Sequence, residues 1–349
     1  MKYIKLLTVS LCLFAILIQC KKDDTNPDEQ PTPYDLVIPT GFPDMEIPED
    51  NSFTVEGIAL GRRLFYDPIL SGDNTQSCSS CHAQAFAFSD NGLQFSVGID
   101  GLAGNRNAPT IINPGWTTSM FWDGREPTLE AQAGGPVPNP IEMHLEWVDA
   151  EAKLNAHEEY PALFKKAFQT DVISQEHVVK AIAQFERTFL SFNSRYDKAL
   201  RNEIFLTEEE ENGFEIYFTE KGDCFHCHGT VLLTDNLFHN NGMDSIFTDK
   251  GLMEISGNPT EEGKFKTPTL RNIEFSAPYM HDGRFATLEE VIDFYSDELK
   301  FSSTIDPLMK NVHQGGLKLN AQEKQDLLAF LKTFTDTSFL NNPDLTDPL

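Results

Sequence analysis

The chain has 349 residues, 40% of them hydrophobic and 23% charged, a composition typical of globular proteins. At roughly 100–200 residues per domain, this length allows two domains. The formal net charge of -27 argues against nucleic acid and anionic membrane surfaces as partners, because both are negatively charged. The charge favours a basic protein partner or a small neutral substrate.

The N-terminus has the pattern of an export signal. A short basic stretch precedes the apolar run Leu6 to Ile18, which falls short of the ~20 apolar residues of a membrane-spanning helix. The stretch "AILIQCKKDD" resembles a bacterial lipoprotein signal, which implies cleavage before Cys20 and a lipid on its sulfur; an ordinary signal peptide with an incidental cysteine is the alternative. We therefore predict a signal peptide over 1–19 and an exported protein of the periplasm or cell envelope, in contact with the membrane only through its lipid anchor.

Residues 20–48 are rich in Asp, Pro and Lys, which predicts a disordered tether. Apolar residues at helical spacing follow in segments 54–67, 175–189, 206–222 and 320–334. Two of these segments carry a capping pattern, T-x-x-E at Thr207 and N-x-x-E at Asn320. Most of the remaining chain is rich in Gly, Pro and Asn and predicts loops, so we expect a mainly α-helical protein.

Two C-x-x-C-H motifs, "CSSCH" at 78–82 and "CFHCH" at 224–228, predict covalent haem attachment. Two thiols on one helical turn can form thioethers with the two haem vinyl groups, and the next residue brings an imidazole beneath the iron. A thioredoxin-like redox pair does not require the histidine, and a four-cysteine zinc site would leave both histidines unexplained. The predicted haem attachment residues and proximal ligands are Cys78, Cys81 and His82 for one haem c, and Cys224, Cys227 and His228 for a second.

A second repeat accompanies the haem motifs. "NAPTIIN" (107–113) and "FWDGREPTLE" (121–130) recur as "KTPTLRN" (266–272) and "MHDGRFATLE" (280–289), at a constant offset of 159 residues. The sequence therefore predicts two tandem cytochrome c-like domains, over 49–203 and 204–349, each with a P-T…D-G-R…T-L-E wall opposite its haem.

The two copies differ where a distal iron ligand would lie. After T-L-E, the second copy places Tyr295 on an apolar helix, and the equivalent position of the first copy is Pro136, which has no donor atom. This difference predicts a closed C-terminal haem and an open N-terminal haem. The first copy also offers Gln132 and Glu142 in a Pro/Gly-rich loop near the open site. A carboxylate there could take a proton from bound hydrogen peroxide and return it to the leaving oxygen.

These motifs together resemble one known family, the bacterial di-haem cytochrome c peroxidases, including the di-haem enzyme that matures methylamine dehydrogenase. The resemblance spans about residues 50–335 and rests on "LGRRLFYDPILS", "CSSCH", "RNAPTIIN", "FWDGR", "GPVPNPIEM", "TPTLRN", "APYMHDG" and "CFHCH". It implies that the N-terminal haem is the peroxidatic centre, with Glu142 as acid–base residue and Gln132 lining the pocket. The C-terminal haem would accept electrons from a small cytochrome c or cupredoxin, and Trp122 would relay them.

The resemblance also implies a calcium ion at the domain interface, held by Asn107 and by backbone oxygens around Ser276 and Pro278. His281, which replaces Trp122 in the second copy, is expected to contact a haem propionate or the interface, or to be structural. A group of four histidines without any partner pattern is expected at the surface: His157, His177, His239 and His313.

The chain departs from the better-known peroxidases in two respects. Many of them have a histidine shortly before R-N-A-P that caps the resting peroxidatic haem, whereas this chain reads "FSVGIDGLAGNRNAP". We therefore expect an N-terminal haem that is five-coordinate or water-bound at rest and needs no reductive activation. The peroxidases also use methionine as distal ligand of the C-terminal haem, where the maturation enzyme uses tyrosine. Alignment from T-L-E favours Tyr295, with Met280, Met309 or another methionine as alternatives.

The sequence therefore predicts an exported di-haem peroxidase that reduces hydrogen peroxide to water. The alternatives are oxidation of a protein side chain, as in MauG-like enzymes, and a non-catalytic di-haem electron-transfer protein. A homodimer is compatible with the sequence.

Overall fold

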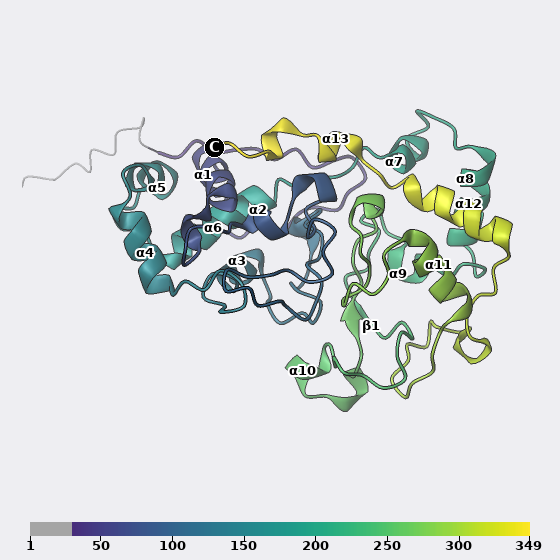
Figure 1. Ribbon diagram of the computed structural model, residues 1–349. Helices are drawn as coiled ribbons and strands as arrows, with labels where there is room; N and C mark the ends of the chain where they lie inside the picture. The colour runs from purple at the N-terminus through teal and green to yellow at the C-terminus, as the bar shows by residue number, and fades with distance from the viewer. Residues whose placement is uncertain (1–29) are drawn as a thin grey trace, which may run out of the picture. The chain divides into compact units, whose positions relative to one another are not determined.

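α-Helices make up most of the regular structure in the computed structural model, which describes residues 30–349 (Figure 1). The predicted export signal and Cys20 lie outside the described residues. Thirteen α-helices and one two-stranded antiparallel sheet are found within 30–349. The helices are α1 Val55–Tyr66, α2 Cys78–Cys81, α3 Leu129–Gly134, α4 Trp147–Ala156, α5 Tyr160–Phe168, α6 Gln175–Glu186, α7 Arg195–Leu200, α8 Glu208–Tyr217, α9 Phe225–His228, α10 Met253–Ser256, α11 Leu288–Asp297, α12 Ala321–Lys332 and α13 Thr337–Leu340, and the strands are β1 Phe238–His239 and β2 Phe265–Lys266. In this part of the chain, no helix combines the length and the apolar character that crossing a membrane requires.

The four predicted helical segments are confirmed as α1, α6, α8 and α12, and their capping patterns are confirmed as well. Thr207 at the start of α8 accepts a hydrogen bond from the Glu210 backbone N–H, while the Glu210 carboxylate accepts one from the Thr207 N–H. Asn320 and Glu323 form the same reciprocal pair at the start of α12. These bonds satisfy backbone donors that the first helical turn leaves without partners.

Close helix pairs anchor the helix that precedes each C-x-x-C-H motif. Helix α1 packs against α6, where a Cβ on Gly61 would lie only 1.9 Å from the Ala181 carbonyl oxygen. Helix α8 packs against α12 in the same way, since a Cβ on Gly213 would lie 2.1 Å from the Asp326 carbonyl oxygen. Glycine is therefore required at both crossings, because any side chain would force the helices apart.

The P-T…D-G-R…T-L-E repeat builds the same local structure twice. Asn113 and Asn272 both adopt left-handed φ values, 51° and 54°, and each begins a short 3₁₀ turn. Thr128 and Thr287 cap α3 and α11 with their hydroxyl oxygens. The repeat that the sequence predicted is therefore confirmed as a structural repeat.

The C-terminal tail departs from the predicted domain organisation. Phe339 of α13 and Leu345 are buried in an aromatic cluster with Phe65 and Phe88 from the N-terminal half. Tyr66 in α1 donates a 2.5 Å hydrogen bond to the Leu345 carbonyl. Residues 337–345 thus pack on the N-terminal half, not within the predicted domain 204–349, because their apolar side chains complete the core there. Contacts join Pro31–Leu349 into one unit, so a boundary at 203/204 stays a prediction.

The segment before α1 is also packed. The Tyr34 N–H donates a 3.1 Å hydrogen bond to the Phe53 carbonyl, and Met45 is buried. The ring of Phe42 lies 5.4 Å from that of Trp116. The disordered tether predicted over 20–48 is therefore wrong for residues 31–48, because apolar side chains within this polar stretch find cover on the N-terminal half.

Truncation of Phe339 tests the role of the tail. Its side chain is 2% exposed, so Phe339→Ala should lower the free energy of unfolding by about 3–5 kcal/mol. Leu349→Ala is the matched control, since Leu349 is 62% exposed and its loss should change stability by less than about 0.5 kcal/mol. Urea denaturation of both variants measures the difference, and equal midpoints would contradict the packing described here.

Candidate active site

The N-terminal motif presents two thiols and an imidazole to one pocket. Cys78 and Cys81 begin and end α2, are free thiols, and line this pocket together with His82. The His82 Nδ1 lies 2.8 Å from the Phe88 carbonyl oxygen. With Nδ1–H donated to that carbonyl, the lone pair of Nε2 remains available for iron, and burial lowers the pKa of the imidazole and favours this neutral form.

The C-terminal motif repeats this geometry. The His228 Nδ1 lies 2.9 Å from the Leu233 carbonyl oxygen, and Leu233 has a left-handed φ of 54°, close to the 57° of Phe88. The two P-T threonines hold these loops: Thr110 donates to the carbonyl of Ala87, just before Phe88. Thr269 donates a 2.7 Å hydrogen bond to the carbonyl of Leu232, just before Leu233. The repeated wall therefore positions the loop that orients each proximal histidine.

Both pockets fit a covalently bound haem. Burial raises the pKa of the Cys81 thiol to about 11 and that of Cys224 to about 12, so the thiols lie in apolar surroundings and not in a thiolate site. Candidate metal-binding clusters within 30–349 do not gather the four cysteines, which rules out a shared zinc site in this part of the chain. Each pocket would hold one haem through its two cysteines, with His82 or His228 beneath the iron.

The N-terminal pocket places a carboxyl group beside the first motif, and Pro136 stands where the second copy has Tyr295. Gln132, Pro136 and Glu142 all line it, so the structure brings these predicted residues beside the first motif. Asn139 Nδ2 donates a 2.8 Å hydrogen bond to Glu142 Oε1 and thereby fixes the carboxyl group. Burial raises the pKa of Glu142, although the bond from Asn139 opposes this.

The loop that carries a histidine in many peroxidases presents no imidazole here. It contributes Ser96, Val97 and Gly98 to the pocket wall. His144, two residues after Glu142, is exposed, and its Nδ1 lies 2.5 Å from the Asp100 carboxylate. Among the described residues that line this pocket, His82 is the only histidine.

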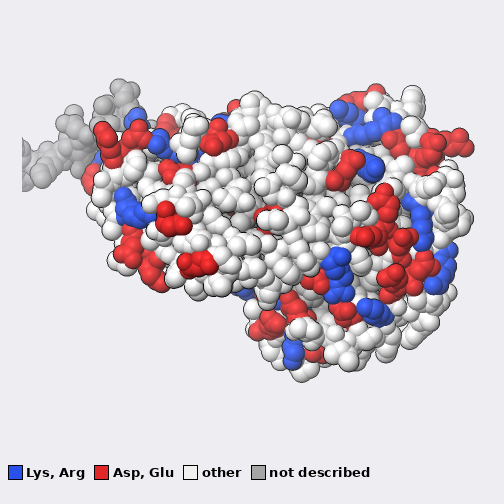
Figure 2. Space-filling view, in the orientation of Figure 1, with Lys and Arg blue, Asp and Glu red and all other residues white. Residues whose placement is uncertain are grey.

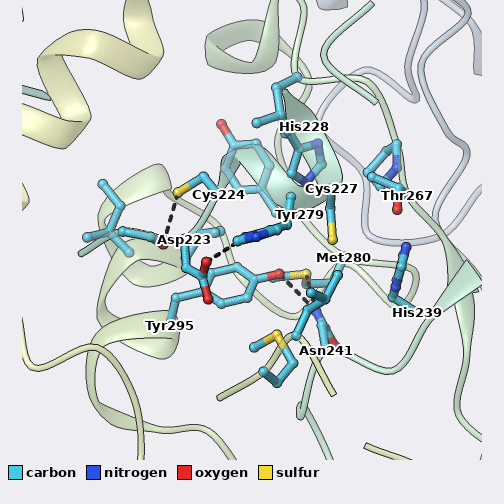
Figure 3. A pocket seen from close by; sticks show the side chains of 18 of the residues that line it. Asp223, Cys224, Cys227, His228, His239, Asn241, Thr267, Tyr279, Met280 and Tyr295 are labelled. Atoms are coloured by element: carbon cyan, nitrogen blue, oxygen red, sulfur yellow. Dashed lines mark hydrogen bonds and ion pairs between the residues drawn. The ribbon is translucent and has the colours of Figure 1, made fainter. Parts of the chain in front are cut away.

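The C-terminal pocket contains the predicted tyrosine together with a methionine alternative (Figure 3). Asn241 Nδ2 donates a 3.0 Å hydrogen bond to Tyr295 Oη and lies 3.8 Å from Met280 Sδ. The Tyr295 hydroxyl and the Met280 sulfur therefore both lie beside the Asn241 side-chain amide. Burial raises the pKa of Tyr295 to about 12. Met309, the other alternative, also lines this pocket.

Trp122 and its counterpart His281 face each other across the two repeats. Their rings lie 6.5 Å apart, and His281 stacks on Phe265 at 3.6 Å. Trp122 Nε1 donates a 2.8 Å hydrogen bond to the Asn107 carbonyl, and the Asn107 N–H donates one of 2.7 Å to the His281 carbonyl. Both rings line the C-terminal pocket, and the hydrogen bonds through the Asn107 backbone connect Trp122 to His281.

The predicted calcium ligands lie in one neighbourhood without forming a ligand set. The Asn107 amide donates to the carbonyls of Leu93 and Gln94, at 3.0 and 3.2 Å. The Gln94 carbonyl and Pro278 both lie against Gly283, whereas the Ser276 hydroxyl donates to the Ile273 carbonyl. The calcium ion stays a prediction.

Three pocket residues escaped the sequence reasoning: His239, Lys266 and Glu186. His239 was expected at the surface, which is wrong: it lines the C-terminal pocket, and its ring nitrogens lie 2.6 Å from Asp306 and 2.9 Å from Asp235. Hydrogen bonds to Asp235, Cys227 and Asp306 raise its pKa to about 11, although burial opposes this. Burial lowers the pKa of Lys266 to about 8. The repeat register could have revealed Lys266, which is the counterpart of Asn107 at the offset of 159 residues.

The fold and the two motifs together define a di-haem c-type cytochrome with one carboxyl-containing and one tyrosine-containing pocket. A family model described as di-haem cytochrome c peroxidase matches residues 55–204. The methylamine utilization protein MauG of Methylorubrum extorquens is 35% identical over 300 residues, covering 82% of this chain and 80% of that protein. Cytochrome c551 peroxidase of Nitrosomonas europaea is 34% identical over 296 residues, covering 83% and 82%.

Solved structures include proteins with a similar fold. A MauG-like protein associated with microbial copper homeostasis has a TM-score of 0.84 and 40% identity, covering 90% of this chain and 99% of that one. The di-haem peroxidase BthA of Burkholderia thailandensis has a TM-score of 0.71 at 22% identity, covering 85% and 91%, a likeness of fold. The chain belongs to the di-haem cytochrome c peroxidase family, which includes MauG-like members. It is accordingly an oxidoreductase of a family that carries two c-type haems.

Proposed function

We propose that this protein reduces hydrogen peroxide to water in its N-terminal pocket. The observation that carries the proposal is the half-buried Glu142, held by Asn139 beside Pro136 and the C-x-x-C-H motif. Pro136, at the position equivalent to Tyr295, has no donor atom that could occupy a sixth coordination position. An electron carrier needs neither a fixed carboxyl group nor an open position.

The residues of this pocket suit acid–base catalysis. A haem bound there would supply an iron that binds peroxide and accepts its oxidising equivalents. Glu142 takes the proton from one peroxide oxygen and returns it to the other as the O–O bond breaks. Asn139 holds the carboxyl group toward the pocket, and Gln132 lines the same wall and can hydrogen bond to peroxide.

Electrons would enter through the C-terminal haem and pass by way of Trp122, whose indole is tied to the Asn107–His281 bridge. Figure 2 shows acidic side chains gathered over the C-terminal half with basic ones among them. Several of the basic groups are already paired, as Lys324 is with Asp293 and Asp297 at 2.7 Å each. The remaining negative charge favours a basic donor, a small cytochrome c or cupredoxin. The export signal would place this exchange in the periplasm or cell envelope, with Cys20 as lipid anchor.

A second candidate function is MauG-like oxidation of a protein side chain. Tyr295 favours it, because tyrosinate lowers the potential of haem iron and stabilises its oxidised state. The 40% identity with a MauG-like protein associated with copper homeostasis points the same way. The two functions share the N-terminal chemistry and differ in where the electrons originate: a soluble donor in one, a side chain of another protein in the other.

Spectra of the resting protein test the proposed function. We expect one high-spin and one low-spin haem, immediate reaction with peroxide without prior reduction, and oxidation of two reduced donor molecules per peroxide. Fast reaction with peroxide but slow donor oxidation would favour the MauG-like function, and peptide mass spectrometry of a partner would then reveal an oxidised side chain. Two low-spin haems that are inert to peroxide would contradict both enzymatic functions and favour a non-catalytic electron-transfer protein.

Glu142→Gln should lower kcat/KM for peroxide by about 10²–10⁴-fold, because the amide cannot accept the proton. The base must be ionised to act, and burial raises its pKa. In the wild type, kcat/KM should therefore rise as pH increases through this raised pKa and level off above it. Glu146→Gln, four residues further along and exposed, is the control and should retain wild-type kinetics. Equal pH profiles for wild type and Glu142→Gln would contradict the role of Glu142.

Tyr295→Phe should convert the low-spin haem to high spin, or raise its potential if Met280 replaces the phenolate, because methionine ligation raises haem potential. Tyr279→Phe is the matched control: Tyr279 lines the same pocket, but its hydroxyl donates to the Ile273 carbonyl. Optical and electron paramagnetic resonance spectra measure the change. Spectra of Tyr295→Phe identical to those of the wild type would assign the ligand to a methionine instead.

A further inference from the structure

The N-terminal pocket contains a second carboxyl group, Glu186, which the mechanism above does not use. Glu186 is the last residue of α6, is 3% exposed, and lines the pocket together with Cys78 and Glu142. Its Oε2 is buried and has no hydrogen-bond partner among the described residues. The neighbouring cation is engaged elsewhere, since Arg187 bonds both oxygens of Glu130 at 2.7 and 2.9 Å.

An ionised carboxylate in this position would be costly, because burial without a partner removes its hydration. Burial raises the pKa of Glu186 to about 8, Arg187 opposes this, and Glu130 adds to it. The titratable groups that face Glu186 are Cys78 from α2 and Glu142 from the loop after α3, in addition to Glu130 from α3 and Arg187 from its own helix. At neutral pH the side chain is therefore mainly a neutral carboxylic acid.

The position of Glu186 limits what it can do. It lies near the Cys78 thiol: burial raises the pKa of that thiol, and the proximity of Glu186 adds to this. Because Cys78 would hold the haem through a thioether, Glu186 would lie beside that attachment. What remains is a buried proton beside the pocket in which peroxide would react.

The stoichiometry of the proposed reaction requires such a proton. Reduction follows H₂O₂ + 2e⁻ + 2H⁺ → 2H₂O, so two protons are consumed for each peroxide. Glu142 moves one proton between the two peroxide oxygens and returns to its starting state, and it thus supplies none. The two protons of the overall reaction must enter the pocket by another route.

We propose that Glu186 is the proton-supplying residue of the N-terminal pocket. This inference rests on the proposed function, the reduction of peroxide in this pocket. Each electron that arrives is matched by one proton, which Glu186 passes to the pocket through water or Glu142. The carboxylate left behind is unstable in its buried position and takes a replacement proton from solvent before the next electron arrives.

Infrared spectroscopy of the holoprotein tests whether Glu186 holds a proton. The wild type should show a protonated-carboxyl C=O band at neutral pH that shifts in D₂O and disappears as pH rises through about 8. Glu186→Gln, which keeps the size of the side chain, should lack this band. Glu186→Asp should restore it, and Glu176→Gln, an exposed change on the same helix, should leave it intact. A wild type without the band, or Glu186→Gln with it, would overturn the inference.

Proton uptake during turnover provides the second measurement. In stopped flow with a pH indicator, Glu186→Gln should take up protons roughly tenfold or more slowly than the wild type, while the initial reaction with peroxide keeps its rate. Equal uptake rates would overturn the inference. A wild type that shows the infrared band but does not turn over peroxide would instead contradict the proposed function, so the two failures are distinguishable.

Discussion

Two reciprocal backbone hydrogen bonds tie the two haem repeats together, and the arrangement of both pockets depends on them. The Asn107 N–H donates to the His281 carbonyl at 2.7 Å, and the Lys266 N–H donates to the Trp122 carbonyl at 2.9 Å. Asn107 and Lys266 are equivalent positions of the repeat, and so are Trp122 and His281. Each copy of the repeat thus donates one backbone hydrogen bond to the other copy, and the two bonds join equivalent positions. Buried peptide groups rarely remain unpaired, because desolvation without a partner is costly, so a shift of one wall relative to the other would break both bonds.

The two copies of the repeat are equivalent where these hydrogen bonds join them, but their pockets contain different distal residues. The same threonine-held loop orients His82 and His228, and the same capped helix follows each D-G-R turn. The equivalent helix positions then diverge, to Pro136 in one copy and Tyr295 in the other. A duplicated scaffold thus leaves the distal residues free to differ, since neither of them supports the loops that hold the proximal histidines.

Much of this arrangement was predictable, because local sequence determines it. The C-x-x-C-H motifs, the capping boxes at Thr207 and Asn320 and the repeat register all depend on residues close together in the chain. Glu186 and His239 could not be found in this way. Glu186 follows the apolar stripe of α6, and only the packing of that helix turns it toward Cys78. His239 meets Asp306 from 67 residues away, a contact that no spacing rule encodes.

The packing of Phe339 and Leu345 beside Phe88 has a consequence for how the chain matures. The carbonyl of Phe88 orients His82, so the loop that prepares the first proximal ligand belongs to a core that Phe339 and Leu345, far along the chain, help to complete. A chain that emerges N-terminus first presents Cys78 and Cys81 long before that core can close. The thiols of the first motif can therefore meet haem before this core is complete.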